Sequence, residues 1–368
     1  MKPDPLYIVQ IVPYYPPHLG GVEQRVKRLS DQLAERGRTV HVVTSDSSGQ
    51  KEETENPKVH YLPGKEVANS PILWKLPFTL WRMPKNSVFH IHIAQAFLPE
   101  VATLVAKLRG IPYVVHYRMD VEATSKAGAL LPLYKKLVLG PVMRGARKVI
   151  VLTPDYAALA HKKFGVQRKR LVVIPNATDF SVSRHAKGRA RAPLRLLFVG
   201  RLAIQKDPLL FVKLTEYYKR KYGDVQAIMV GEGPMRPEIE AYINQKGLHD
   251  IIRLVGQKNG RQLEDYYARS DIFVLTSHGE SFGTVLIEAM AKGLPIVSTR
   301  IPAVRNIVKQ GINGLLASAT PQALAKACRI LVKDHEQYKA MSKANLAETK
   351  KYNWPAIIDQ TEEVYRSL

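Results

Sequence analysis

The chain has one cysteine, Cys328, among 368 residues. A single thiol excludes an internal disulfide and is typical of a reducing compartment, and its helical context predicts a packed side chain. No apolar run approaches the ~18–20 residues that a membrane-spanning helix needs. Residues 1–5 lead straight into an apolar strand and lack the layout of a secretory signal. We therefore expect a cytoplasmic protein without a transmembrane segment.

Metal-binding patterns are also missing from the sequence. It contains no Asp-x-Asp, no His-Glu-x-x-His and no paired-cysteine spacing. Any diphosphate bound here would have to be neutralised by arginine, lysine and backbone amides. We expect no metal site.

Acidic residues are scarce relative to basic ones, 32 against 55, which gives a net charge of +23. Residues 1–180 carry 26 basic and 14 acidic residues (+12), and the remainder carries 29 and 18 (+11). The excess is therefore general, and it favours polyanionic partners: nucleic acid, an anionic membrane surface or phosphorylated substrates. No nucleic-acid recognition motif is present, and the basic residues are not interleaved with aromatics on strands.

Short apolar runs alternate with helical patterns through both halves of the chain, as expected of parallel sheets in an α/β fold. The length predicts two domains, and a basic stretch without an apolar stripe separates them. We predict a Rossmann-like domain at 1–180, a linker at 181–193, a second Rossmann-like domain at 194–353, and a last helix at 354–368 that packs back on the first. Residues 46–60 are predicted to be an exposed polar excursion. The predicted strands are 6–12, 39–44, 88–93, 112–116, 149–153, 194–199, 226–230, 251–255, 272–275 and 295–298.

A strand-to-helix turn in the second half carries two glutamates. Glu280 follows the predicted strand, and Glu288 lies about one turn inside the predicted helix 285–292. Ligands of open parallel sheets bind at the carboxyl ends of the strands, and a helix start offers unpaired amides to an anion. Alternatively, the turn is ordinary scaffold of a doubly wound domain.

Three further features follow strands. Arg201 and Lys206 lie in the loop after 194–199 and suit a diphosphate, or else belong to a solvated loop. The pair Gly20-Gly21 would let a backbone approach a phosphate closely, or else forms a tight turn. His116 ends another strand, where a histidine is either structural or directed at a ligand.

Two other patterns carry less information. The segment 231–234, Gly-Glu-Gly-Pro, is a partial glycine fingerprint that lacks the third glycine of an NAD site. His90 and His92 alternate on one strand, and we predict that they are core or cleft-wall residues.

Taken together in their order and spacing, these motifs resemble the retaining, nucleotide-sugar-dependent glycosyltransferases of family four, which adopt the GT-B fold. The resemblance runs nearly end to end. It rests on 20–23, His116, 175–179, 199–201 with Lys206, 231–234, the pair Glu280 and Glu288, 311–316 and the terminal helix that begins at Trp354.

The resemblance implies two Rossmann-like domains that face a central cleft, and it assigns the diphosphate of the donor to Arg201 and Lys206. The amides of Gly283 and Thr284 would assist them, and Gly21 would close over the phosphate from the other domain. Family members use no metal, and stabilisation of the departing diphosphate is then the main catalytic effect.

The resemblance also assigns the sugar end of the donor. Glu288 would bind the ribose hydroxyls, Glu280 would face the donor sugar, and His116 would contact that sugar from the opposite wall. The implied catalytic residues are His116, Arg201, Lys206 and Glu280, and the implied donor-binding residues are Gly20, Gly21, Arg201, Lys206, Gly231, Glu280, Ser281, Phe282, Gly283, Thr284 and Glu288.

Two positions depart from the family pattern. Asn306 stands where members often carry an acid, which we expect to alter the wall of the donor pocket more than the chemistry. His116 is followed by Tyr-Arg-Met-Asp, so that Asp120 is a neighbour of the site.

The stretch 69–85 mixes two Trp, a Phe and aliphatic residues with basic side chains. This composition suits an anionic membrane interface, and it equally suits a short helix packed beneath the first domain. Basic residues at 135–148 would extend the same face. We therefore expect a peripheral membrane enzyme with a lipid or lipid-linked acceptor.

The expected activity is retaining transfer of a hexose from a UDP- or GDP-sugar to an acceptor hydroxyl in cell-envelope glycoconjugate synthesis. The nucleotide sugar is a co-substrate, and no cofactor is expected. Two alternatives remain: a nucleotide-sugar 2-epimerase of the same fold, and a basic nucleic-acid-binding protein.

Overall fold

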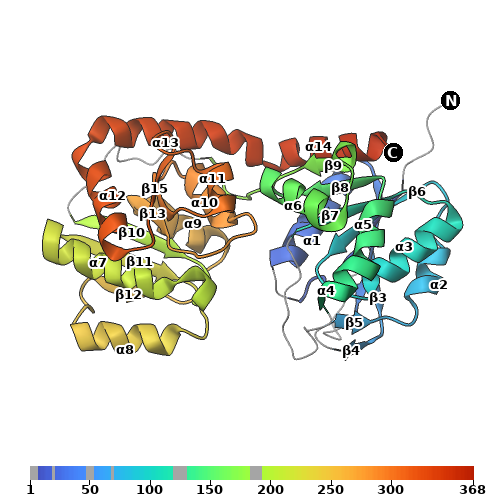
Figure 1. Cartoon of the computed structure of the whole chain (residues 1–368), viewed down its shortest axis with the longest axis horizontal. Coiled ribbons are helices and arrows are strands. Elements are labelled where there is room, and N and C mark those ends of the chain that lie inside the picture. The colour runs from blue at the N-terminus through green and yellow to red at the C-terminus, as the bar shows by residue number, and fades with distance from the viewer. Residues whose placement is uncertain (1–6, 19–20, 47–53, 68–69, 119–130, 183–192) are drawn as a thin grey trace. The chain divides into compact units, whose positions relative to one another are not determined.

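The computed structural model describes residues 7–18, 21–46, 54–67, 70–118, 131–182 and 193–368. The chain divides into two compact units, Met1–Pro175 with Trp354–Leu368, and Asn176–Asn353 (Figure 1). Each unit contains a parallel sheet with helices packed on it, as the α/β alternation predicted.

The first unit contains a seven-stranded parallel sheet in the order β3-β2-β1-β6-β7-β8-β9. Central β1 pairs with β2 on one side and with β6 on the other, which is the crossover pattern of a doubly wound sheet. The strands are β1 (Tyr7–Ile11), β2 (Thr39–Ser45), β3 (Lys58–Leu62), β6 (Ser87–Ile93), β7 (Tyr113–Tyr117), β8 (Lys148–Val151) and β9 (Leu171–Val173).

The two faces of this sheet carry different side chains. Because side chains alternate along a strand, Phe89 and Ile91 of β6 point to one face, into the main apolar core of the unit. His90 and His92 of the same strand point to the other face, beside Gln10, which pairs with His90 across the β1–β6 register. This part of the second face is therefore polar although it is buried.

The last helix, α14 (Trp354–Arg366), belongs to the first unit. Arg36 and Arg38, just beyond α1 (Gly21–Glu35), both form ion pairs with Glu362, at 3.3 and 2.6 Å. One face of α14 is buried, including Tyr365 near its end.

Residues 46–60 are not wholly an exposed excursion, because residues 58–60 belong to β3 and pair with β2. The partner strand supplies the hydrogen bonds that a polar segment needs in order to form an edge strand. A small antiparallel pair, β4 (Lys65–Val67) and β5 (Ser70–Ile72), follows.

The stretch 69–85 contains a short helix, α2 (Leu76–Trp81), with a buried and an exposed side. Leu76 and Leu80 pack in the core, whereas Trp74, Phe78 and Trp81 are 53, 68 and 54% exposed. Helix α2 packs against α3 (Leu98–Arg109). Arg109 of α3 donates to the carbonyl oxygens of Leu80 and Met83 and lies over the Trp81 ring. Lys135 is buried, so it does not extend an exposed basic face.

The other helical segments of the unit are α4 (Leu131–Tyr134), a π-helical turn (Lys135–Leu139), α5 (Gly140–Gly145), α6 (Pro154–Phe164) and a 3-10 turn (Arg168–Arg170).

The second unit contains a six-stranded parallel sheet in the order β12-β11-β10-β13-β14-β15. Its last strand, β15, was not predicted. Cys328 is buried in the core of this unit, as predicted. The strands are β10 (Leu194–Val199), β11 (Val225–Val230), β12 (Ile252–Leu254), β13 (Ile272–Leu275), β14 (Ile296–Thr299) and β15 (Gly314–Ala317).

Helices alternate with these strands along the chain (Figure 1). Several begin at a side-chain cap, for example α12, where the Thr320 hydroxyl accepts from the Ala323 amide. None of the described helices is both long and apolar enough to span a membrane. The helical segments are a 3-10 turn (Ile204–Lys206), α7 (Pro208–Tyr222), α8 (Arg236–Lys246), α9 (Gly260–Arg269), α10 (Thr284–Ala291), α11 (Pro302–Ile307), α12 (Pro321–Lys333), α13 (His335–Thr349) and a second 3-10 turn (Lys350–Tyr352).

Candidate active site

In the second unit, the loops that follow β10 and β13 are joined at the carboxyl edge of the sheet. The Thr276 hydroxyl donates to the carbonyl oxygens of Lys206 and Asp207, at 2.9 and 2.8 Å. The His278 amide donates to the Gln205 carbonyl at 2.9 Å. These bonds link two loops that are about 70 residues apart in sequence, so the predicted residues of both loops lie in one place.

Lys206 and Glu280 form an ion pair in this place. Nζ of Lys206 lies 2.5 Å from Oε1 of Glu280, and the same oxygen accepts from the Ser277 hydroxyl at 2.8 Å. The Glu280 side chain is only 6% exposed. The two residues that the sequence assigned to diphosphate and sugar are therefore direct partners.

Arg201 lies on the same loop as Lys206, and its guanidinium is exposed. Gly231 and Gly233 pack closely against the backbone of this loop. A Cβ on Gly231 would lie 2.0 Å from the Gly200 oxygen, and one on Gly233 would lie 2.4 Å from the Leu202 oxygen. The glycines of the partial fingerprint thus allow two backbones to pack closely.

The turn into α10 positions the remaining predicted donor residues. Gly283 precedes the helix with a φ of 82°, in the left-handed region that favours glycine, and Thr284 is the first helical residue. Ser281 is half-buried. The Phe282 ring is buried and packs edge-to-face on Tyr352, so only its backbone is placed to meet a ligand.

Glu288 is held by a tyrosine from α9. The buried Tyr267 hydroxyl donates to Oε2 of Glu288 at 2.7 Å. Burial raises the pKa of Tyr267, and the Glu288 carboxylate raises it further, so the hydroxyl remains a donor. This contact holds the Glu288 carboxylate of α10 against α9.

In the first unit, predicted residues lie near the carboxyl ends of β1 and β7. Gly21 begins α1, and a Cβ there would lie 3.8 Å from Nη2 of Arg25. His116 is the penultimate residue of β7 and is buried. Gly20 and Asp120 lie outside the described residues.

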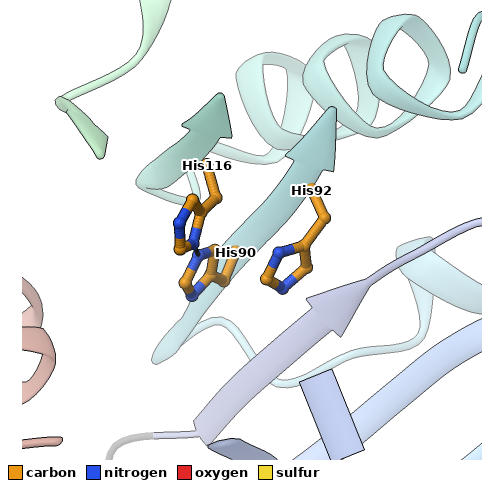
Figure 2. Close-up of side chains that lie close together, drawn as sticks. All are labelled: His90, His92 and His116. Atoms are coloured by element: carbon orange, nitrogen blue, oxygen red, sulfur yellow. Dashed lines mark hydrogen bonds between the residues drawn. The ribbon is translucent and has the colours of Figure 1, made fainter. Parts of the chain in front are cut away.

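His116 belongs to a cluster of three buried imidazoles with His90 and His92 (Figure 2). Nε2 of His90 lies 3.3 Å from Nδ1 of His116. Nδ1 of His90 lies 2.6 Å from the Tyr365 hydroxyl, and Nε2 of His92 lies 2.7 Å from Oε1 of Gln10. The prediction that His90 and His92 are core residues is confirmed, and they contact the predicted site residue directly.

The imidazoles of this cluster are neutral. Burial lowers the pKa of His90 to about 3, with a further contribution from the charge of Arg118. Burial and neighbouring charges also lower the pKa values of His92 and His116 well below their ordinary value. Arg118 is itself buried, and burial together with the charge of Arg25 lowers its pKa to about 9.

Family models match the greater part of both units. A model described as Glycosyltransferase Family 4 matches residues 19–182, and one described as Glycosyl transferases group 1 matches residues 179–347. The chain belongs to the family-4 glycosyltransferases.

Similar proteins include a phosphatidylinositol N-acetylglucosaminyltransferase subunit of Homo sapiens, 26% identical over 97% of this chain and 75% of that protein. D-inositol 3-phosphate glycosyltransferase of Kineococcus radiotolerans is 26% identical over 94% of this chain and 90% of that protein.

Among solved structures, a glycosyltransferase from Rickettsia africae has a TM-score of 0.79 at 16% identity, covering 99% of this chain and 98% of that one. Anabaena HepE in complex with UDP-glucose has a TM-score of 0.74 at 17% identity, covering 98% of this chain and 100% of that one. The fold is therefore GT-B, and the glycosyltransferase transfers a sugar from a nucleotide sugar to an acceptor.

Sequence reasoning missed several residues that contact the predicted site residues or their neighbours. Tyr267, Tyr365 and Gln10 lie in apolar or amphipathic patterns and gave no separate signal. Arg118 did offer one, since a charged residue directly after a buried strand lies at the carboxyl edge of the sheet. Asn306, the departure from the family pattern, lies in α11 and donates to the Pro302 carbonyl at 3.3 Å.

The three histidines are also the group of described residues that could offer three ligand atoms to one metal ion, since those atoms lie within 4.8 Å of one another. Two features of the cluster oppose a cation. The positive charges of Arg118 and Arg25 act on it, and Nε2 of His90 and Nδ1 of His116 face each other at hydrogen-bond distance.

Proposed function

We propose that the protein is a retaining, metal-independent hexosyltransferase that uses a UDP- or GDP-sugar and a membrane lipid or lipid-linked acceptor. The observation that carries this proposal is the loop pair of the second unit. It gathers Arg201, Lys206 and Glu280 beside the start of α10.

The leaving group is a nucleoside diphosphate, whose negative charge grows as the sugar departs. The exposed Arg201 guanidinium and the Lys206 ammonium would neutralise that charge, with the amides at the start of α10. Groups that are already in place when charge develops are the main source of electrostatic catalysis. Such a set makes a divalent cation unnecessary.

Retention is supported by the state of Glu280. Its Oε1 accepts from both Lys206 and Ser277, so the carboxylate is oriented by two donors. A carboxylate held in this way suits binding of the sugar and orientation of the Lys206 ammonium. It suits nucleophilic attack on the anomeric carbon less well. We therefore propose that the acceptor hydroxyl attacks on the face from which the diphosphate leaves, and that Glu288 binds the ribose.

An exposed apolar surface of the first unit supports a membrane acceptor. We call it the α2–α3 surface. Eight of the fifteen large exposed hydrophobic side chains among the described residues lie on α2, on α3, on the segment 131–139 or, for Trp74, two residues before α2. Exposed apolar side chains that gather in this way mark an interaction surface. The eight side chains are Trp74, Phe78, Trp81, Leu104, Leu108, Leu133, Leu137 and Val138.

Basic side chains accompany the α2–α3 surface. Lys75, Arg82, Lys85, Lys107 and Lys136 are all exposed. Indole rings among lysine and arginine suit the headgroup region of an anionic bilayer, where each basic residue contributes about 1 kcal/mol. The two relatives named above act, by their names, on phosphatidylinositol and on inositol 3-phosphate. We propose an inositol-bearing or similar phosphorylated headgroup as the acceptor.

A donor panel tests the catalytic proposal. UDP-GlcNAc, UDP-glucose and GDP-mannose are incubated with EDTA and with vesicles that contain phosphatidylinositol, and nucleotide release and the anomeric configuration of the product are measured. We expect one donor to be consumed with retention, and a loss of about 100-fold in Arg201→Ala. Arg253→Ala, an exposed arginine of the same unit, should keep its activity. An epimerised donor without transfer would favour the epimerase alternative, and an inverted product would refute retention.

Vesicle flotation tests the membrane proposal. Phe78→Ser with Leu108→Ser should weaken binding to anionic vesicles at least tenfold. Ile312→Ser with Ile330→Ser removes two exposed aliphatic side chains from the second unit and should leave binding unchanged. Equal binding by both double variants would contradict the role of the α2–α3 surface.

A further inference from the structure

A continuous chain of hydrogen bonds leads from the last helix of the protein to His116. The chain consists of Gln10 of β1, Tyr365 of α14, His90 of β6 and His116 of β7, all within the first unit. Every member is buried. At its far end, Nε2 of His116 has no hydrogen-bond partner among the residues that the structure describes.

The direction of the chain follows from the Gln10 amide. Its oxygen accepts from Nε2 of His92 at 2.7 Å, so its nitrogen is the atom that donates to the Tyr365 oxygen, at 3.4 Å. Among the described residues, Nδ1 of His90 is the acceptor within hydrogen-bond distance of the Tyr365 hydroxyl, at 2.6 Å, so we assign the phenol as the donor in this contact. Burial raises the pKa of Tyr365, so the phenol keeps that proton.

The ring nitrogens that carry the protons of His90 and His116 follow from this direction. A neutral imidazole carries one N–H. With Nδ1 accepting, His90 carries its proton on Nε2 and donates it to Nδ1 of His116, at 3.3 Å. His116 in turn carries its proton on Nε2, the buried atom without a partner among the described residues.

We propose that Tyr365 is a positioning residue that, through His90, holds His116 as the Nε2–H tautomer, so that His116 donates a hydrogen bond to a hydroxyl of the sugar substrate. This inference rests on the proposed function in one respect, the identity of the ligand that meets Nε2. A buried N–H without a partner is costly, and a substrate hydroxyl would remove that cost at the moment of binding. His116 is thereby a donor to the substrate and is not a general base.

The hydrogen-bond chain also gives α14 a role, which is to position His116 through Tyr365. Tyr365 lies 249 residues after His116 in the sequence, yet two hydrogen bonds separate them. Loss of the last turn of α14 would remove the phenol and leave His116 free to carry its proton on either nitrogen.

The test measures the tautomer directly. The full-length protein is labelled with ¹⁵N-histidine, and long-range ¹H–¹⁵N correlations distinguish protonated from unprotonated ring nitrogens, with His116→Gln to assign the signal. We expect wild-type His116 to be protonated on Nε2. Tyr365→Phe removes only the hydroxyl and should give a mixture of tautomers, with kcat/KM for the donor reduced about tenfold, the loss expected for one hydrogen bond.

Tyr113→Phe is the matched control, because it removes a buried tyrosine hydroxyl of the same unit that donates to the Val142 carbonyl instead. It should leave the His116 tautomer and kcat/KM as in the wild type. If Tyr365→Phe does not fold, Gln10→Glu replaces it: a carboxylate accepts from both His92 and Tyr365, which reverses the chain and protonates Nδ1 of His116.

Three outcomes would overturn the proposal. They are an Nδ1–H tautomer in the wild type, a tautomer that Tyr365→Phe leaves unchanged, and one equivalent of bound metal in the purified protein, which would occupy the nitrogens that form the chain. The tautomer is measured without substrate. A wild type that consumes no nucleotide sugar would therefore refute the proposed function and leave the tautomer result standing.

Discussion

Nζ of Lys206 lies 2.5 Å from Oε1 of Glu280, and this contact joins the loop after β10 to the loop after β13. The lysine proposed to meet the diphosphate is thus held by the glutamate proposed to face the sugar. Binding of the donor would bring the anionic diphosphate to Lys206 while Ser277 continues to donate to Glu280.

Glu280→Gln should lower turnover more than donor affinity. The amide keeps the shape of the side chain but loses the charge that orients Lys206, so we expect kcat to fall about 10- to 100-fold while KM for the donor changes less than about threefold. Steady-state kinetics on the active donor measure both values.

Glu264→Gln is the matched control for this variant. Glu264 forms a second Lys–Glu pair of the same unit, with Lys292 at 2.6 Å. Its loss should affect stability and leave kcat unchanged. Wild-type kcat in Glu280→Gln would contradict the role assigned to Glu280.

Tyr267→Phe should weaken donor binding without slowing the chemical step. The variant removes the hydroxyl that donates to Glu288 at 2.7 Å, so the carboxylate loses its fixed orientation toward the ribose. We expect KM for the donor to rise about fivefold with kcat unchanged, and Glu288→Ala to raise it further. Isothermal titration with the free nucleotide diphosphate gives an independent measure of affinity.

The control here is Tyr338→Phe. The Tyr338 hydroxyl is also buried in the second unit, but it donates to the Asp271 carbonyl. If both variants raise KM equally, the effect is a general loss of stability and the contact with Glu288 is irrelevant to donor binding.

Much of the fold could be predicted because the strands are continuous apolar runs. Leu194–Val199 and Ile272–Leu275 were predicted with the same bounds that the structure has. The strand Lys58–Leu62 was not, because polar Lys58 and His60 interrupt its apolar residues and it is held by pairing with β2, a long-range contact that no local pattern records.

The site could be predicted only in part, for a similar reason. Lys206 and Glu280 lie in loops that follow strands and Glu288 lies about one turn inside α10, and these positions indicate a ligand-binding edge. Tyr267 and Tyr365 act from the buried faces of α9 and α14, where an aromatic residue is typical of a core position. Their function depends on which polar atom each hydroxyl meets, and that is set by tertiary packing.

Gly231→Ala should destabilise the second unit and displace the Arg201 loop. A Cβ at this position would lie 2.0 Å from the Gly200 oxygen, a backbone atom that cannot move without separating β10 from β11, and φ is 138°. We expect a loss of roughly 3 kcal/mol in the free energy of unfolding and a higher KM for the donor.

The expected loss has two causes, crowding against the Gly200 oxygen and the positive φ, and Gly247→Ala separates them. Gly247 also has a positive φ, 61°, but a Cβ there meets nothing within 4 Å. It should cost only about 1 kcal/mol and leave KM unchanged. Urea denaturation of both variants measures the difference, and equal losses would show that crowding against Gly200 contributes nothing.

The buried histidines should make the protein less stable as the pH falls below about 6.5. Burial lowers the pKa of His90 to about 3 and those of His92 and His116 well below their ordinary value, and the charge of Arg118 adds to the effect at each. In the unfolded chain the same groups titrate near about 6.5. Between pH 6.5 and about 3 the unfolded state therefore binds more protons than the folded state, so the free energy of unfolding decreases with decreasing pH.

The expected size of this effect is about 1.4 kcal/mol per imidazole between pH 7.5 and 5.5, or roughly 4 kcal/mol for the three. Urea denaturation at the two pH values measures it. His92→Gln should reduce the loss by about 1.4 kcal/mol, because one group that must stay neutral in the folded state has been removed. His335→Gln changes an exposed residue of α13 and should leave the loss unaltered. An equal free energy of unfolding at pH 7.5 and 5.5 in the wild type would mean that the cluster accepts protons while folded, and the neutral hydrogen-bond chain from Tyr365 to His116 would then be wrong as well.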